Sequence, residues 1–267
     1  FEGSFMRKIS ICGKGGSGKS VVVTLMANVL REKGYSVLVV DSDESNSGLY
    51  RMLGFDKAPQ PLMGLVGGKR GAQQKMRSKF SSGEAEPKME ILEQDEFFTE
   101  GIPPQCFVEK DGIKLIAIGK IVQSLEGCAC PMGVLSREFL GKLSLEEREI
   151  AIVDMEAGVE HFGRGIETST DAVLIPVEPS FESLMLAERI KGFAVDIEIG
   201  DIWAILNKVT SEEVDIKLRE ELGKRDVPVV GSIYYDPQVF QACLEGKPLS
   251  EGSAKQDMKR IVGLLLK

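Results

Sequence analysis

The chain has 267 residues, of which 43% are hydrophobic and 28% are charged, and its formal net charge is -8. This length and apolar content allow a substantial core in one or two domains and exclude a disordered chain. The acidic balance disfavours nucleic acid as a partner, and no apolar run reaches the roughly 20 residues of a membrane-spanning helix. Five cysteines without a secretory signal favour a reducing, cytoplasmic location over a disulfide framework.

Apolar runs alternate with helical patterns along the chain. Strands are expected at residues 8–12, 36–41, 113–118, 150–154, 172–177, 202–207 and 229–233. Helices are expected at residues 19–33, 182–195, 211–224 and 237–244. Because the strand runs are continuously apolar, they are typical of strands covered on both faces. The alternation predicts an α/β fold, a doubly wound and mostly parallel sheet flanked by helices.

No repeat or linker interrupts residues 6–267, so a single domain is expected. Residues 1–5 precede Met6 and are interpreted as an appended remnant. Residues 57–104 break the pattern, because they are rich in Gly, Lys, Gln, Glu and Pro. Two interpretations of this insertion stay open: a partly ordered surface segment, or a lid or partner-docking arm.

A phosphate-binding motif follows the first expected strand and opens the first expected helix. Its residues are Gly13, Lys14, Gly15, Gly16, Ser17, Gly18, Lys19 and Ser20, which match G-x-x-x-x-G-K-[ST]. The glycines let backbone N–H groups surround phosphate oxygens, and the helix N-terminus adds a favourable dipole. Lys19 is expected to reach the β- and γ-phosphates, and Ser20 to bind Mg²⁺. The motif therefore predicts a P-loop ATPase that binds ATP, ADP and Mg²⁺.

Lys14 turns this loop into K-G-G-x-G-K. That sequence resembles the deviant Walker A motif of the family that contains MinD, ParA and the nitrogenase iron protein. The resemblance implies a homodimer with two sandwiched ATP molecules, in which Lys14 contacts the partner's nucleotide. Such a lysine would neutralise developing phosphate charge much as an arginine finger does.

Three carboxylates follow expected strands. Asp41 and Asp43 end the run VVDSD, and Asp154 ends the run IAIVD. Carboxylates at strand ends beside a P-loop suit Mg²⁺ and its waters, so Asp41 and Asp154 are expected to support the metal. By resemblance to the family's switch I segment, Asp43 positions or deprotonates the attacking water. The alternative is that Asp43 only caps the turn before Ser45 and Asn46.

Further resemblances concern the γ-phosphate and the base. Residues 155–158 occupy the position of the family's switch II, where the N–H of Gly158 would meet the γ-phosphate. Glu156 departs from the usual family pattern, and no role is assigned to it. Asn207 follows a strand, and its amide can donate to and accept from an adenine edge. Residues 231–237 resemble the second base-contacting loop of the family.

A pair of cysteines, Cys128 and Cys130, follows the third long strand run. In a reducing cytoplasm two such thiols favour metal over a disulfide. A thiolate site usually takes four ligands, so a symmetric dimer would complete it with two cysteines from each chain. Zinc and nickel are both compatible with thiolate ligands. The alternative is two ordinary cysteines near a turn.

A more specific resemblance is carried by G-C-A-C-P at residues 127–131 and V-D-M-E-A-G-V-E-H-F-G-R-G at residues 153–165. These segments look like the CooC-type ATPases, which help deliver nickel to carbon monoxide dehydrogenase. The resemblance implies a metal at Cys128 and Cys130 across the dimer interface and that enzyme as client. Cys12 is expected in the core. His161, the single histidine, is expected to have a structural role linked to switch II rather than to bind metal.

Two rival functions stay open. The first is an iron–sulfur electron carrier like the nitrogenase iron protein, although that protein's two cysteines per chain lie far apart in sequence. The second is a MinD-like switch recruited to membranes by residues 258–267, which form an apolar stripe with basic residues. The same spacing also predicts simple packing of that stripe on the sheet.

Overall fold

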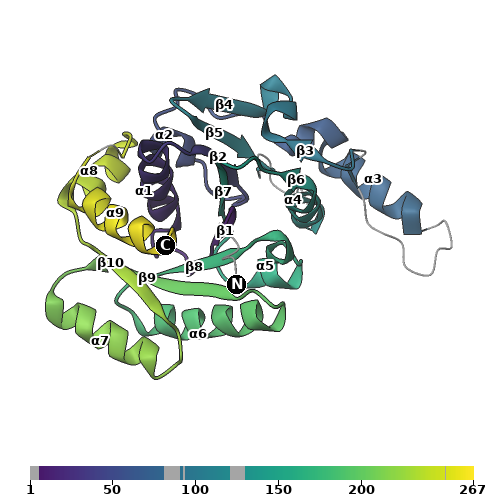
Figure 1. The fold of residues 1–267 in the computed structure, drawn as a ribbon. Helices are drawn as coiled ribbons and strands as arrows, with labels where there is room; N and C mark the ends of the chain where they lie inside the picture. Colours follow the sequence, from purple (N-terminus) through teal and green to yellow (C-terminus); the bar gives the residue numbers. More distant parts are fainter. Residues whose placement is uncertain (1–5, 81–90, 93, 121–129, 250) are drawn as a thin grey trace.

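The main sheet crosses the whole molecule (Figure 1). The computed structural model describes residues 6–80, 91–92, 94–120, 130–249 and 251–267. Within them, eight strands form one sheet in the order β10-β9-β8-β1-β7-β2-β5-β4, and β3 pairs with β6 separately. All neighbours in the main sheet are parallel except the antiparallel pair β4–β5. The strands are β1 (Lys8–Ile11), β2 (Ser36–Asp41), β3 (Phe97–Phe98), β4 (Phe107–Lys110), β5 (Ile113–Ala117), β6 (Leu143–Ser144), β7 (Glu149–Asp154), β8 (Ala172–Val177), β9 (Asp201–Val209) and β10 (Val229–Tyr234).

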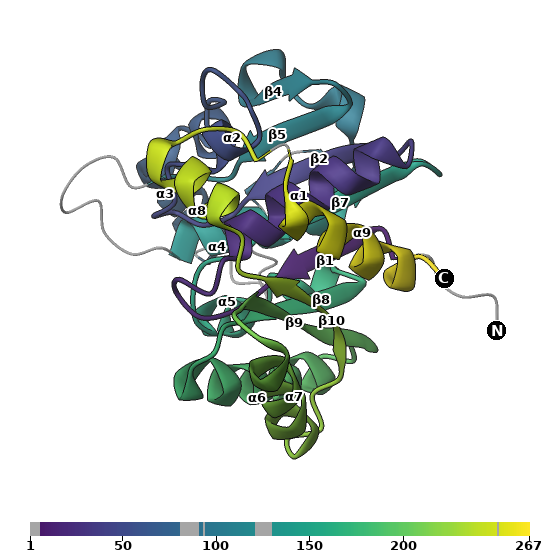
Figure 2. The ribbon, with the colours of Figure 1, turned by 90° about the vertical axis from the view of Figure 1, so that its left-hand side faces the viewer.

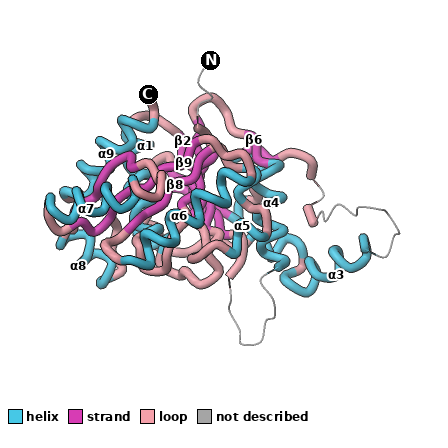
Figure 3. Tube along the Cα trace, turned by 90° about the horizontal axis from the view of Figure 1, so that it is seen from below, coloured by secondary structure: helices cyan, strands magenta, loops and turns pink. Residues whose placement is uncertain are grey.

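Helices cover both faces of this sheet. The α-helices are α1 (Lys19–Glu32), α2 (Leu49–Met52), α3 (Gly68–Phe80), α4 (Cys130–Lys142), α5 (Glu160–Gly163), α6 (Phe181–Asp196), α7 (Glu212–Gly223), α8 (Pro237–Glu245) and α9 (Ser253–Leu265). Short 3-10 turns are η1 (Leu62–Val66), η2 (Thr99–Gly101), η3 (Pro104–Cys106) and η4 (Glu167–Ser169). Helices α1 and α9 lie together on one face (Figure 2), whereas α4 and α6 lie on the other (Figure 3).

Strand β2 shows why the chain builds two cores. Its apolar residues point alternately to the two faces of the sheet. Val37 and Val39 join the cluster under α1 and α9, whereas Leu38 and Val40 join the cluster under α4 and α6. The interior of a strand between two helical layers must therefore be continuously apolar, as residues 37–40 of β2 are.

The fold confirms the predicted doubly wound sheet, and most predicted elements differ from the observed ones by one or two residues at their ends. The sequence analysis missed α4 and the antiparallel edge strand β4. In the 57–104 segment, η1 and α3 contribute buried side chains to the main core, among them Leu62, Met63 and Ala72. The single-domain assignment and the role of this segment stay predictions.

Helix α9 contains the apolar stripe for which membrane binding was the rival interpretation. Met258, Ile261 and Val262 are all buried, in the same cluster as residues of α1 and β10. The structure therefore supports packing on the sheet for these side chains. Among the described residues, no helix combines the length and apolarity needed to cross a bilayer.

Candidate functional site

The P-loop connects β1 to α1 at the carboxyl edge of the sheet. Gly16 and Gly18 have φ of 82° and 92°, in the left-handed region that favours glycine. Gly18 is the N-cap of α1, and a Cβ atom there would collide with the amide of Asn207. Glycine at position 18 is thus required both by backbone conformation and by the close approach of β9.

The N-terminus of α1 is built to receive an anion. Gly18 provides no side-chain cap, and the first turn of α1 contains no acidic residue. The first N–H groups of a helix have no partner within the helix and carry the positive end of its dipole. By contrast, Ser180 and Ser211 cap the N-termini of α6 and α7 with their own side chains. The different treatment of α1 leaves its first amides available to phosphate oxygens.

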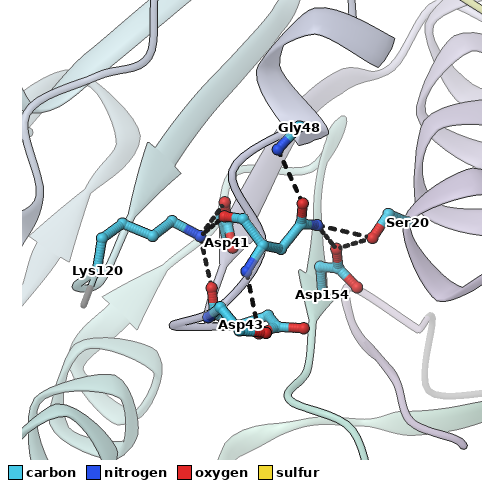
Figure 4. A network of polar contacts seen from close by, with 8 residues as sticks. Ser20, Asp41, Asp43, Gly48, Lys120 and Asp154 are labelled. Atoms are coloured by element: carbon cyan, nitrogen blue, oxygen red, sulfur yellow. Dashed lines mark hydrogen bonds and ion pairs between the residues drawn. The ribbon is translucent and has the colours of Figure 1, made fainter. Parts of the chain in front are cut away.

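Two aspartates from neighbouring strands face this helix end. In the register of β2 and β7, Asp41 pairs with Asp154, so their side chains leave the sheet at the same level. The Ser20 hydroxyl donates to Asp154 Oδ2 at 2.7 Å. Figure 4 shows this cluster with Asp43 and Lys120 beside it. The structure thus brings together Ser20, Asp41 and Asp154, the three residues predicted to hold Mg²⁺.

The cluster carries more negative charge than its protein partners satisfy. Burial raises the pKa of Asp41 to about 7 and that of Asp154 to about 6, and the charge of Asp43 adds to both shifts. Asp41 Oδ1 and Asp154 Oδ1 are buried without a hydrogen-bond partner among the described residues. Unpaired carboxylate oxygens beside a serine hydroxyl are the hard ligands that Mg²⁺ prefers. The residues present therefore fit a magnesium ion.

Magnesium affinity should depend on pH because the ion competes with protons for these carboxylates. Below pH 7, Asp41 mostly holds a proton that Mg²⁺ must displace, so affinity should fall about fivefold as pH drops from 7 to 6. Above pH 8 the dependence should level off. Calorimetric titration of Mg²⁺ into ADP-loaded protein at pH 6, 7 and 8 measures this. Asp41→Asn should make magnesium affinity nearly independent of pH in this range. If affinity in that variant still falls with pH as in the wild type, the competing proton binds a group other than Asp41.

The loop after β2 occupies the same space. The Asn46 amide donates to Ser20 Oγ at 2.8 Å and to Asp154 Oδ2 at 3.2 Å. Lys120 pairs with Asp41 at 2.7 Å and also donates to the backbone carbonyls of Asp43 and Asn46. A neutral amide donor in the loop after β2 and a charged ammonium after β5 thus face the carboxylates.

Sequence analysis did not identify Lys120 or Asn46 as site residues. The available signal was weak: Lys120 is a charged residue shortly after a buried strand, at the edge where parallel strands end. Only the sheet order, in which β5 lies next to β2, brings Lys120 to Asp41.

Asp43 makes the contacts of a cap. Its Oδ1 accepts from the Ser45 N–H at 2.9 Å, the Ser45 hydroxyl at 2.7 Å and the Asn46 N–H at 3.3 Å. These bonds fix the turn that leads into α2. In this conformation the residue plays the role given as the alternative in the sequence analysis, and its part in hydrolysis stays a prediction.

Lys14 lies at the rim of the loop, paired within its own chain. Its Nζ is 2.8 Å from Glu178 Oε1, and the other oxygen of Glu178 is 2.9 Å from Lys208 Nζ. Lys208 also donates to the Gly16 carbonyl. Glu178 was not identified from the sequence, although it directly follows a buried strand, β8, at the carboxyl edge.

A largely apolar cavity of about 350 Å³ opens beside the P-loop, lined by Gly18, Asn207, Lys208, Tyr234 and Val239 among others. Asn207 donates from its amide to the Ser17 carbonyl at 2.8 Å. The cavity therefore unites the two predicted base-binding segments, which lie at the ends of β9 and β10.

The segment after β7 contacts the P-loop through backbone and buried side chains. The N–H of Gly158 donates to the Gly13 carbonyl at 3.2 Å, and the Gly158 carbonyl accepts from His161 Nε2 at 3.1 Å. His161 Nδ1 pairs with Glu167, which also accepts from the Cys12 thiol at 3.9 Å. All three of these side chains are completely buried.

This buried chain supports the structural interpretation of His161 and the core position of Cys12. Both ring nitrogens of His161 have protein partners. Burial and the neighbouring Glu167 raise the pKa of Cys12 well above its usual value, so the thiol stays protonated and can donate. The contacts from Cys12 through Glu167 to His161 link the end of β1, the strand before the P-loop, to the switch II segment.

Glu156 pairs with Arg164 at 2.9 Å, so the unusual switch II carboxylate is neutralised within the same segment. Both side chains are partly exposed, at 35% and 26%.

The cysteine pair lies largely outside the described residues. Cys128 is not described, and Cys130 is described only as the first residue of α4. The predicted metal site at these two positions therefore stays a prediction. Of the other cysteines, Cys106 is buried, whereas Cys243 is exposed on α8.

Comparisons with known proteins agree with this geometry. A family model described as the CobQ/CobB/MinD/ParA nucleotide binding domain matches residues 9–249. An uncharacterized ATP-binding protein of Methanocaldococcus jannaschii is 41% identical over 265 residues, which cover 97% of this chain and 100% of that protein. The carbon monoxide dehydrogenase accessory protein CooC of Rhodospirillum rubrum is 32% identical, covering 88% of this chain and 86% of that protein.

The fold is also similar to a solved structure. The cell division ATPase MinD of Pyrococcus furiosus matches with a TM-score of 0.66 at 18% identity, covering 97% of this chain and 98% of that one. The family model spans the P-loop, strands β2 and β7 and most of the residues that line the cavity. This chain therefore belongs to the CobQ/CobB/MinD/ParA family of nucleotide-binding domains.

Proposed function

We propose that this chain is a cytoplasmic, ATP-hydrolysing maturation factor that dimerises with ATP and binds a metal ion through Cys128 and Cys130. The observation that carries the ATPase part is the convergence of three features at one sheet edge. They are an uncapped helix N-terminus, unpaired buried carboxylates and a base-sized cavity. The similarity to an ATP-binding relative supports ATP as the nucleotide.

In this proposal the residues of the P-loop act on the phosphates. The amides of Gly15 to Ser20 surround them, and Lys19 contacts the β- and γ-phosphates. Ser20, Asp41 and Asp154 would hold Mg²⁺, which supplies further neutralisation of phosphate charge when bound.

The attacking water is the task of switch I. In the present conformation the Asn46 amide occupies Ser20 and Asp154, two of the proposed magnesium ligands. The loop that contains Asp43 and Asn46 would first move away from them, and Asp43 would then orient the attacking water. Lys14 of each chain would contact the nucleotide of the other and complete the site.

The metal part is supported by the similarity to the carbon monoxide dehydrogenase accessory protein and by the Cys-x-Cys pair, whose second cysteine is the first residue of α4. Nickel delivery to that enzyme is the function this similarity favours. ATP would close the dimer and bring the four thiols together, and hydrolysis would reopen it. Such a cycle requires ATP to bind the closed state more tightly than the open one.

Cys128→Ser and Cys130→Ser should each abolish tight metal binding and leave ATP binding nearly unchanged, because the thiols and the P-loop belong to different segments. A four-thiolate site predicts about one metal per dimer, and the metal should stabilise the dimer. Titration of Zn²⁺ or Ni²⁺ into reduced, metal-free protein, followed by analytical ultracentrifugation, tests both. Cys243→Ser is the matched control and should retain the metal. One metal per chain without a change in sedimentation would eliminate the bridging site.

A MinD-like membrane switch is the second candidate, favoured by the fold similarity to MinD. The buried side chains of Met258, Ile261 and Val262 in α9 count against a membrane-binding stripe at these positions. Co-sedimentation with liposomes in the presence of ATP separates the two functions.

A further inference from the structure

Glu178 is a carboxylate in an unexpected place. It directly follows β8 at the edge where the P-loop lies, and a negative charge there opposes the binding of phosphates. Its backbone is firmly held: its N–H donates to the buried Ser183 hydroxyl at 3.2 Å, and its carbonyl accepts from the Ser180 N–H at 2.7 Å. The side chain is only 17% exposed. A largely buried carboxylate beside an anion-binding site is unfavourable unless a cationic side chain neutralises its charge.

That side chain is Lys14. The two side chains meet at 2.8 Å, and Lys14 is 34% exposed. Burial alone would raise the pKa of Glu178, but hydrogen bonds from Lys14 and Lys208 outweigh it and lower the pKa, so the group stays charged. While Lys14 is paired in this way, its ammonium is engaged by a carboxylate of its own chain.

Lys208 makes the release of Lys14 less costly. It binds the other oxygen of Glu178 at 2.9 Å and also donates to the Gly16 carbonyl. Its backbone has φ of 58°, which is uncommon for a residue with a side chain and indicates that tertiary contacts hold it there. When Lys14 leaves, Glu178 therefore keeps one cationic partner and is not left as a bare charge.

We propose that Glu178 is a positioning residue that holds Lys14 within its own chain in the resting state and releases it to the nucleotide of a second copy. The inference rests on the proposed ATP-dependent dimer and deepens it. The ion pair opposes dimer closure, so the dimer forms only when the partner's phosphates outcompete the carboxylate for the lysine. Glu178 thus sets the threshold at which ATP closes the dimer.

The test compares three variants by analytical ultracentrifugation with a saturating non-hydrolysable ATP analogue. Glu178→Gln removes the charge, and Glu178→Asp keeps the charge but shortens its reach. Both should tighten the dimer, roughly threefold to tenfold, the range expected for a partly exposed charged hydrogen bond. Glu182→Gln is the matched control. The pKa of Lys14 is raised mainly by its hydrogen bond with Glu178 and only weakly by the charge of Glu182, so this variant should dimerise like the wild type.

A second comparison places the effect on Lys14. In a Lys14→Ala background, Glu178→Gln should no longer tighten the dimer, because there is no lysine to release. Because the nucleotide is saturating, a change in the affinity of the monomer for nucleotide does not alter the measured dimer affinity. Fluorescent ADP titration measures that nucleotide affinity separately. A wild type that dimerises with ATP and a Glu178→Gln variant that dimerises equally well would overturn the role of Glu178 alone. A wild type that never dimerises would overturn both this role and the proposed function.

Discussion

Lys19→Ala is expected to lower the rate of ATP hydrolysis at least about 100-fold and to weaken nucleotide binding. The expected size follows from the loss of one preorganised positive group facing developing charge. Lys19 is buried at the first turn of α1, and its charge also lowers the pKa of Asp154 against the larger effect of burial. The alanine variant therefore loses a phosphate contact and a counter-charge for the magnesium-facing carboxylates together.

Phosphate release and fluorescent ADP titration measure the two effects. Lys33→Ala is the matched control: the same change at the exposed C-cap of the same helix should leave both quantities unchanged. Because Lys19 is buried, thermal unfolding of the variant must show that it remains folded. Wild-type hydrolysis in a folded Lys19→Ala variant would refute the assignment of this loop to ATP.

Asp43→Ala is expected to slow hydrolysis by about 100-fold or more while ATP stays bound, which should trap the closed dimer. The reason is the proposed role in orienting water. The structure adds a complication, because Asp43 Oδ1 accepts three hydrogen bonds from Ser45 and Asn46. Alanine removes these bonds as well as the charge.

Asp43→Asn separates the two roles. Its amide oxygen can still accept from the Ser45 N–H, so the turn should persist, whereas an amide cannot take a proton from water. Slow hydrolysis in both variants, with an ATP-dependent dimer seen by light scattering, supports the catalytic role. If only the alanine variant is slow, Asp43 serves the turn. Absence of an ATP-dependent dimer in either variant would contradict the closing cycle.

The features predictable from the sequence were those encoded locally. The P-loop is one continuous segment, and the apolar runs that end in Asp41 and Asp154 identify parallel strands. Because parallel strands end at the same edge, the meeting of these two aspartates with Ser20 followed from the pattern.

The partners of these residues were not predictable. Lys120 meets Asp41 only because β5 lies beside β2, and Glu178 meets Lys14 only because β8 lies beside β1. Sequence patterns give the edge at which a charged side chain lies, but not which opposite charge it faces. Helix α4 was missed because Pro131 and Gly133 in its first turn are residue types that indicate a turn, although Val134, Leu135 and Phe139 further along are buried.

Asn207 has a consequence for how nucleotide selectivity can evolve. Its amide supports the Ser17 carbonyl of the P-loop and also lines the base cavity, and the close packing against it permits only glycine at position 18. An asparagine has two N–H donors and one acceptor, so one donor is already committed to the phosphate loop. A substitution of Asn207 that changed the base preference would therefore also remove this support of the P-loop and weaken phosphate binding. Selectivity would therefore be altered more easily through Tyr234 and Val239, which line the same cavity from β10 and α8.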